Sequence, residues 1–377
     1  MKTVKKKMFY ALLLFLLGLS GLQAQQQAAR PYWFILEQGK FAFRSGKYGE
    51  ALIAFEQAKR ERRSMYEYME QAMIDILSIY EVRRMEDNLE RIEEYINERH
   101  HVDAASALAE LYYRVPKDSL QGSGQRALEE LKELKDYPEA EYWIGEVYRI
   151  EGELNIALLQ YQKAYDQREF LENTGFEIEI LYKMIDLLKI RQDYSAMTAK
   201  AQEILALDTR WQGDTGIRTR NAMMRILQNE GVNRLLAVYR HDNFSVERVH
   251  RTLGLYYYAI EQYERAAEHL MFSFLIQNTL LIEEMLLSRY DFSFSNLNAL
   301  FEVLGRRRDL LEYIDDVEYY KTVYYFGAAL YSFGKTAPAQ QLWTFLSQQN
   351  DIGEWSGRAR NQLRRPFIEK VQDIILD

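Results

Sequence analysis

The chain has 377 residues, of which 48% are hydrophobic and 28% are charged, and its formal net charge is −8. This composition is globular and excludes an intrinsically disordered chain, while the acidic balance argues against general nucleic-acid binding, which needs basic surface. The absence of cysteine excludes disulfides, thiolate metal sites, a cysteine nucleophile and a lipid-modified cysteine.

Residues 1–24 are predicted to be a secretory signal peptide. Four lysines stand among the first seven residues, residues 8–19 are uncharged and mostly apolar, and small or polar residues lead to Gln25. This apolar stretch is shorter than the ~20 residues that cross a bilayer. We expect cleavage before Gln25, no transmembrane span in the mature chain, and export to a bacterial periplasm or, alternatively, secretion. Cleavage removes four lysines and no acid, so the net charge becomes −12.

The chain after Arg30 is predicted to be helical. Apolar residues recur at steps of three and four, as in residues 154–165, and no run alternates like a strand. Glycine-containing breaks at Gly46, 151–152 and 334–335 separate the helices. No segment is long enough to be a linker between domains, so we expect a single elongated all-α domain over residues 25–377.

One spacing pattern recurs four times. A glycine is followed 12 positions later by alanine, 16 later by a bulky residue and 19 later usually by a small one. The four sets are Gly39, Ala51, Phe55, Ala58; Gly145, Ala157, Tyr161, Ala164; Gly254, Ala266, Leu270, Ser273; and Gly327, Ala339, Trp343, Leu346. The pattern indicates two helices that cross closely, because a larger side chain in place of the glycine would push their axes apart.

The intervals between these glycines indicate further repeats. They are 106, 109 and 73 residues, close to three, three and two multiples of ~34. The clear repeats lie near 32–65, 138–171, 247–280 and 320–353. We expect degenerate helix pairs between them, at 65–98, 102–134, 181–204 and 278–304. In the third of these, the second helix would present Tyr194, Met197, Ala201 and Ile204.

The repeats resemble the tetratricopeptide repeat (TPR) family. Further positions of its motif are present in Ile144-Gly145 with Tyr148, Leu253-Gly254 with Tyr257 and Tyr263, and Phe326-Gly327 with Leu330. The proline that usually ends the motif is absent, and Gln38 stands where a large apolar residue is usual. The resemblance implies a right-handed α-solenoid of stacked antiparallel helix pairs, whose first helices line a concave groove.

Tyrosine and basic residues on the first helices form a candidate partner-binding strip, because such residues dominate binding hot spots. The strip comprises Lys40, Arg44, Tyr142, Arg149, Arg248, Arg251, Tyr258, Lys321, Tyr324 and Tyr331. The alternative is that the tyrosines continue the packing and the cations are solvated. Basic runs at 59–63, 306–308 and 358–365 are interpreted as solvated helix ends.

Catalytic and metal-binding patterns are not evident. The five histidines show no metal-ligand spacing, and His250 is expected to be a packed, hydrogen-bonded core residue. We expect no cofactor and no enzymatic activity, and a scaffold or adaptor that binds a protein or peptide of the cell envelope. The alternatives are an exported glycan-acting enzyme built as a closed ring of helix pairs, and an accessory ligand-handling subunit of a transporter.

Overall fold

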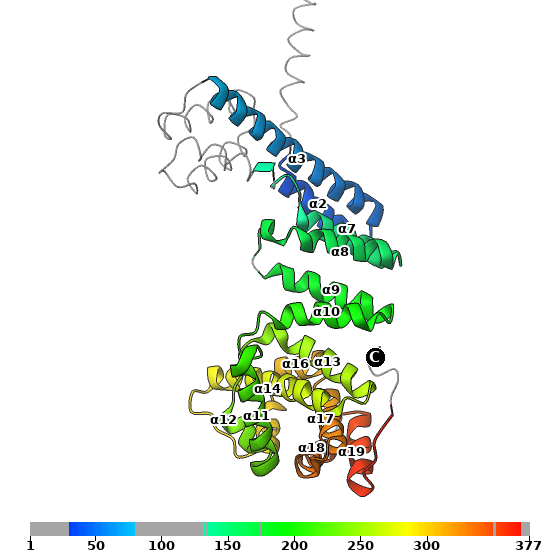
Figure 1. The fold of residues 1–377 in the computed structure, drawn as a ribbon. Coiled ribbons are helices and arrows are strands. Elements are labelled where there is room, and N and C mark those ends of the chain that lie inside the picture. The colour runs from blue at the N-terminus through cyan, green and yellow to red at the C-terminus, as the bar shows by residue number, and fades with distance from the viewer. Residues whose placement is uncertain (1–29, 80–130, 133, 174, 350–351, 371–377) are drawn as a thin grey trace, which may run out of the picture. The chain divides into compact units, whose positions relative to one another are not determined.

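The computed structural model describes residues 30–79, 131–132, 134–173, 175–349 and 352–370, and no strand occurs among them (Figure 1). The predicted all-α class is therefore confirmed for this part of the chain. The predicted signal peptide and almost all of the degenerate pair at 102–134 lie outside the described residues. The chain divides into two compact units, residues 1–180 and 181–377, where the sequence predicts one domain. Their boundary falls inside helix α9 (Phe176–Ile190), so no linker marks it.

The described part of the first unit consists of two helix pairs. Its helices are α2 (Tyr32–Arg44), α3 (Tyr48–Ile79), α7 (Pro138–Ile150) and α8 (Leu154–Asp166), followed by the short 3-10 turn η1 (Arg168–Phe170). Helix α2 packs on α3, α7 packs on α8, and α3 contacts α7. Phe55, Tyr137 and Ile144, each at most 1% exposed, lie in the core that these helices share.

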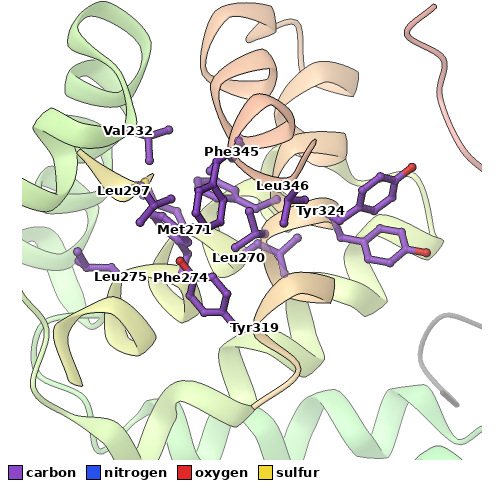
Figure 2. Packing of buried hydrophobic residues seen from close by; sticks show 14 of the residues in the cluster. Val232, Leu270, Met271, Phe274, Leu275, Leu297, Tyr319, Tyr324, Phe345 and Leu346 are labelled. Atoms are coloured by element: carbon purple, nitrogen blue, oxygen red, sulfur yellow. The ribbon is translucent and has the colours of Figure 1, made fainter. Parts of the chain in front are cut away.

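The second unit is built around one long helix, α14. Its helices are α10 (Tyr194–Leu205), α11 (Gly213–Glu230), α12 (Val232–Val238), η2 (Phe244–Val246), α13 (Glu247–Ala259), α14 (Tyr263–Ser288), α15 (Leu297–Leu304), α16 (Arg308–Asp316), α17 (Tyr319–Ser332), α18 (Thr336–Gln348) and α19 (Glu354–Arg364). Figure 2 shows α14 side chains such as Met271 and Phe274 meeting Leu297, Tyr319 and Phe345 from α15, α17 and α18.

Among the described residues, one helix is long and apolar enough to cross a membrane, and this is α14. The core accounts for this composition, because 72% of its most apolar 18-residue window is buried inside the protein.

The same turn joins five helix pairs. Each connector has three residues, and its middle residue has positive φ: 74° at Gly46, 83° at Gly152, 57° at Gln192, 61° at Glu261 and 80° at Gly334. The third residue donates its N–H to the carbonyl five residues earlier, a helix-ending hydrogen bond of the Schellman type. These bonds are Lys47 to Ala42, Glu153 to Tyr148, Asp193 to Leu188, Gln262 to Tyr257 and Lys335 to Leu330, at 2.7–2.9 Å. The five pairs therefore share one local geometry.

The four glycines of the spacing pattern lie where the paired helices cross. A Cβ atom on Gly39 would come 2.5 Å from a ring carbon of Phe55. The corresponding distances are 2.7 Å from Gly145 to Tyr161, 2.6 Å from Gly254 to Leu270 and 2.8 Å from Gly327 to Trp343. Real Cβ contacts are longer, so the bulky residue 16 positions on occupies the space that a side chain at the glycine would need.

The fifth pair, α9 with α10, has the two sizes exchanged. Its turn residue Gln192 places Ile185 at the position of the glycine and Ala201 at the position of the bulky residue. Both side chains are at most 1% exposed, and Met197 and Ile204 are fully buried, as the expected pair at 181–204 requires. By position, the small and the large residue are exchanged between the two helices of this pair.

Two predicted repeat boundaries are wrong. Helix α3 continues to residue 79 and α14 to residue 288, beyond the expected ends at 65 and 280. The predicted separate pair at 278–304 therefore begins inside α14. Helix α14 continues past residue 280 because this region is buried. The side chains on both sides of the expected break are at most 3% exposed: Leu275, Ile276, Leu281 and Ile282.

Candidate partner-binding surface

In the first unit the strip begins on α2, where Lys40 is engaged by neighbours and Arg44 is exposed. Lys40 Nζ lies 2.6 Å from a carboxylate oxygen of Glu37 and 5.7 Å from the ring centroid of Trp143. Arg44 lies in the last turn of α2. The α2 part of the strip thus offers one exposed cation and one cation held over an aromatic ring.

The α7 part of the strip has one partly exposed residue, Arg149, and one buried residue, Tyr142. Arg149 pairs with Glu146 through two hydrogen bonds of 2.9 and 3.1 Å, and the Tyr161 hydroxyl donates to the same carboxylate. Burial and this carboxylate raise the pKa of Tyr161. Tyr142 is 5% exposed and packs against Tyr161, with ring centroids 5.6 Å apart. The prediction that Tyr142 belongs to an open strip is therefore wrong, and the residue has a packing role.

The strip residues of α13 take part in ion pairs within the second unit. Arg248 donates to both carboxylate oxygens of Asp186 at 2.5 and 2.7 Å. Arg251 contacts the carboxylate of Glu247 at 3.4 Å and also pairs with Glu318. Lys321 on α17, 7% exposed, lies 3.1 Å from Glu318. Arg248 joins α13 to α9, and Arg251 joins α13 to the start of α17. Lys321, paired within α17, is corrected from a surface residue to a buried one.

Glu247 is a buried acid at the start of α13. It accepts hydrogen bonds of 2.7 Å from Ser273 and from Gln277 on α14. Desolvation raises its pKa, opposed by Arg251 and by these hydrogen bonds. Because its partners belong to α13 and α14, this carboxylate fixes one helix against the other.

The tyrosines of α13 and α17 are also interior. Tyr258 and Tyr324 are 2% and 1% exposed, so their prediction as residues of an open groove is also corrected. Tyr331 is half-buried, with its ring centroid 5.7 Å from that of Trp343. The sequence left open that these tyrosines continue the packing, and their rings do so. The hydroxyls of Tyr258 and Tyr324 have another role.

Those two hydroxyls contact the chain segment that follows α19, residues 365–370. Tyr258 donates to the main-chain carbonyl of Glu369 at 3.0 Å, and Tyr324 donates to its carboxylate at 2.7 Å. Arg358 donates to the other carboxylate oxygen at 2.5 Å. Local sequence patterns do not indicate this contact, because the acid lies 45 and 111 positions from the tyrosines.

The sequence predicts Arg358 to be part of a solvated basic helix end, and the structure corrects this prediction. Its guanidinium lies 4.6, 5.4 and 4.8 Å from the ring centroids of Tyr324, Tyr325 and Trp355. The only available signal was the position of Trp355 three residues before Arg358 on the same helix face. An arginine held by three rings and a carboxylate has a fixed geometry suited to recognition.

Arg62 corrects the basic run at 59–63 in the same way. It is 2% exposed, and its guanidinium lies 4.6–5.5 Å from the ring centroids of Tyr32, Tyr66 and Tyr137. It also pairs with Glu172 at 3.2 Å. By contrast, Arg308 in the run at 306–308 is 92% exposed, as expected.

His250 is packed and hydrogen-bonded, as predicted. It is fully buried, and its Nδ1 lies 3.0 Å from Nδ1 of His269. The ring of Phe272 stacks on His250, and Trp211 contacts both imidazoles at 4.5–4.7 Å between centroids. Desolvation, with repulsion from neighbouring positive groups, lowers the pKa of both histidines, to about 3 for His269. Among the described residues no group of three or more potential ligands is arranged around a metal position.

A pocket of about 520 Å³ lies between α12, α15 and α18 and is lined by amide and apolar side chains. Several of these amides support the backbone. Gln341 accepts from the N–H of Val232 at 2.9 Å, and Asn296 caps α15 by accepting from Ala299 at 3.0 Å. The pocket is therefore framed by groups that hold helix ends.

Comparison with known proteins gives relatives but no family: no protein-family model matches the chain. It is similar to an uncharacterized protein of Treponema pallidum, 22% identical over 338 residues that cover 88% of this chain and 89% of that protein. It is also similar to an uncharacterized protein of Borreliella burgdorferi, 19% identical over 216 residues that cover 52% of this chain and 67% of that protein.

Proposed function

We propose that this chain is an exported, non-enzymatic scaffold of the bacterial cell envelope, built as a right-handed solenoid of TPR-like helix pairs. The observation that carries the proposal is the recurrence of one turn and one close crossing, with a small residue against a large one, in the helix pairs. Repeats of this kind bury their apolar faces against neighbours and leave a long surface for a partner.

The partner is a protein or peptide that contacts the first helices of the pairs, α2, α7, α13 and α17. Support comes from three cations there that stay partly exposed, Lys40, Arg149 and Arg248. Each is fixed in orientation by an acidic neighbour, Glu37, Glu146 and Asp186 respectively. A surface whose side chains are already ordered loses less entropy on binding. The same internal pairing favours a binding role over catalysis.

Cross-linking tests the location of this surface. The mature chain is incubated with an envelope extract, treated with an amine-reactive cross-linker and digested for mass spectrometry. We expect partner cross-links at Lys40 on α2 and few at Lys163, an exposed lysine on the second helix α8. Equal cross-linking of the two lysines would contradict a surface on the first helices.

Export is proposed from the first 24 residues. N-terminal sequencing of the protein recovered from a periplasmic extract should begin at or near Gln25. Recovery of an uncleaved chain in the cytoplasmic fraction would contradict this part of the proposal.

The two alternatives make different physical predictions. A glycan-acting enzyme with a closed ring of helix pairs would be compact, whereas a solenoid is elongated, and small-angle scattering separates them. A ligand-handling subunit would use a pocket, for which the 520 Å³ pocket is the candidate. Its size suits a small molecule, and calorimetric titration with small glycans would detect such binding.

A further inference from the structure

The segment after α19 lies against α13, α17 and α19 as a bound peptide would. Residues 366–370 have no secondary structure of their own, and their hydrogen bonds go to side chains of those three helices. We propose that these helices form a binding site for an extended acidic peptide and that the chain's own residues 366–370 occupy it in cis. The inference rests on the proposed function, because Tyr258 and Tyr324 belong to first helices of two repeats.

One part of the site binds main chain. The side chain of Gln362, which is fully buried, accepts from the N–H of Phe367 at 3.0 Å and donates to its carbonyl at 3.2 Å. A single amide thus pairs with both main-chain groups of one residue, as a neighbouring β-strand would. This contact requires an extended backbone and places no demand on the side chain of the bound residue.

The other part of the site binds a glutamate two residues later. Arg358 and Tyr324 each donate to one carboxylate oxygen of Glu369, at 2.5 and 2.7 Å, and Tyr258 donates to its main-chain carbonyl. Tyr325 donates nothing to the acid but accepts from Arg358 at 2.8 Å, which orients the guanidinium. Charge-assisted hydrogen bonds of this kind are stronger than neutral ones, so the acid is the main determinant.

The apolar side chains of the segment contribute little to its binding. Phe367 and Ile368 are 49% and 47% exposed, so half of each remains in contact with solvent. The segment is held by polar contacts at Phe367 and Glu369 and by an exposed ion pair of Lys370 with Glu261 at 3.2 Å. An unrelated extended peptide with a suitably placed glutamate could reproduce the contacts at the first two positions. The ligand class is therefore an extended acidic segment, with glutamate two positions after the residue that Gln362 contacts.

Tethering determines how a second peptide would compete. A short flexible connection gives an attached ligand an effective concentration in the millimolar range. Only Arg365 separates the end of α19 from residue 366, so the intramolecular segment competes strongly with any peptide in solution. Weakening the tethered glutamate should open the site without removing any residue of the three helices.

The test measures the binding of a fluorescent peptide to full-length protein by anisotropy. The probe has the sequence of residues 364–370, and a matched probe carries glutamine in place of glutamate. We expect the Glu369→Gln protein to bind the probe at least about tenfold more tightly than wild type does. It should bind the glutamine probe at least about tenfold more weakly than the glutamate probe. Ile368→Ala, a change of a half-exposed side chain in the same segment, should behave as wild type.

Three results would overturn the proposal. The first is equal probe binding by wild type and Glu369→Gln, and the second is equal binding of the two probes. The third is a Glu369→Gln protein that has the melting temperature of wild type but does not bind the probe. If wild type forms a dimer at high concentration and Glu369→Gln is a monomer, the segment of one molecule occupies the site of another. That result would overturn the assignment in cis. Because the probe assay uses no envelope extract, its failure leaves the cross-linking result for the natural partner intact.

Discussion

Gly254 and Leu270 are in contact across the crossing of α13 and α14. A Cβ atom at Gly254 would lie 2.6 Å from Cγ of Leu270 and 3.1 Å from its main-chain nitrogen. The side chain of Leu270 could rotate, but the backbone of α14 cannot retreat without disturbing the buried residues on both sides of it.

Gly254→Leu is therefore expected to destabilise the protein by about 1–3 kcal/mol, the usual cost of overpacking. Chemical denaturation monitored by circular dichroism measures it. Gly357→Ala is the matched control: Gly357 is exposed in α19, and a Cβ there meets nothing within 4 Å. The control should be stabilised by about 0.5–1 kcal/mol, because alanine is the better helix former. A Gly254→Leu midpoint equal to wild type would refute the placement.

The exchanged sizes at Ile185 and Ala201 predict that the crossing tolerates a swap. Leu270→Ala alone should cost about 2–5 kcal/mol through the cavity it leaves, and Gly254→Ile alone should overpack. The double variant should be more stable than the sum of the two effects implies, with a coupling energy of about 0.5–3 kcal/mol. Additive effects in this double-mutant cycle would show that the two residues do not share one space.

Gln192 has positive φ, which is unfavourable for a residue with a side chain. Gln192→Gly should stabilise the protein by about 0.5–1 kcal/mol, because glycine adopts positive φ without steric strain. Three of the other four turns have glycine at this position. The control Gln202→Gly, at an exposed position inside α10, should destabilise by about 1 kcal/mol. Destabilisation by both changes would contradict the turn conformation.

Stability is expected to fall as the pH is lowered below about 6.5. The folded-state pKa of His250 and of His269 lies below the unfolded value of 6.5, so the unfolded chain binds more protons between the two values. For His269, with a pKa of about 3, the loss from pH 6.5 to 5 is about 2 kcal/mol. Glu247, whose folded-state pKa is raised above the ordinary value of 4.5, opposes this trend, because the folded chain takes up that proton before the unfolded chain does.

Denaturation of wild type and His269→Asn at pH 7 and pH 5 tests this dependence. The variant should be less stable at pH 7 but should lose less stability on acidification. Parallel losses in the two proteins would show that His269 does not titrate in this range.

The crossings and turns could be predicted from the sequence because they are set within one helix pair. Glycine at one position and a bulky residue 16 later define a contact through helix geometry alone, and Gly46, Gly152 and Gly334 mark the turns. The same local logic failed at residues 65 and 280, where α3 and α14 continue. In α14 the residues on both sides of the expected break are buried in the core of the second unit.

The state of the strip residues depended on tertiary structure. Tyr324 on α17 and Arg358 on α19 meet Glu369, and Arg251 meets Glu318, 67 positions away along the chain. Helical periodicity specifies which face a side chain occupies but not what packs against that face. The sequence thus determined the helix pairs and their close approach, whereas only the folded chain decided which polar side chains were already paired, because those partners come from other elements.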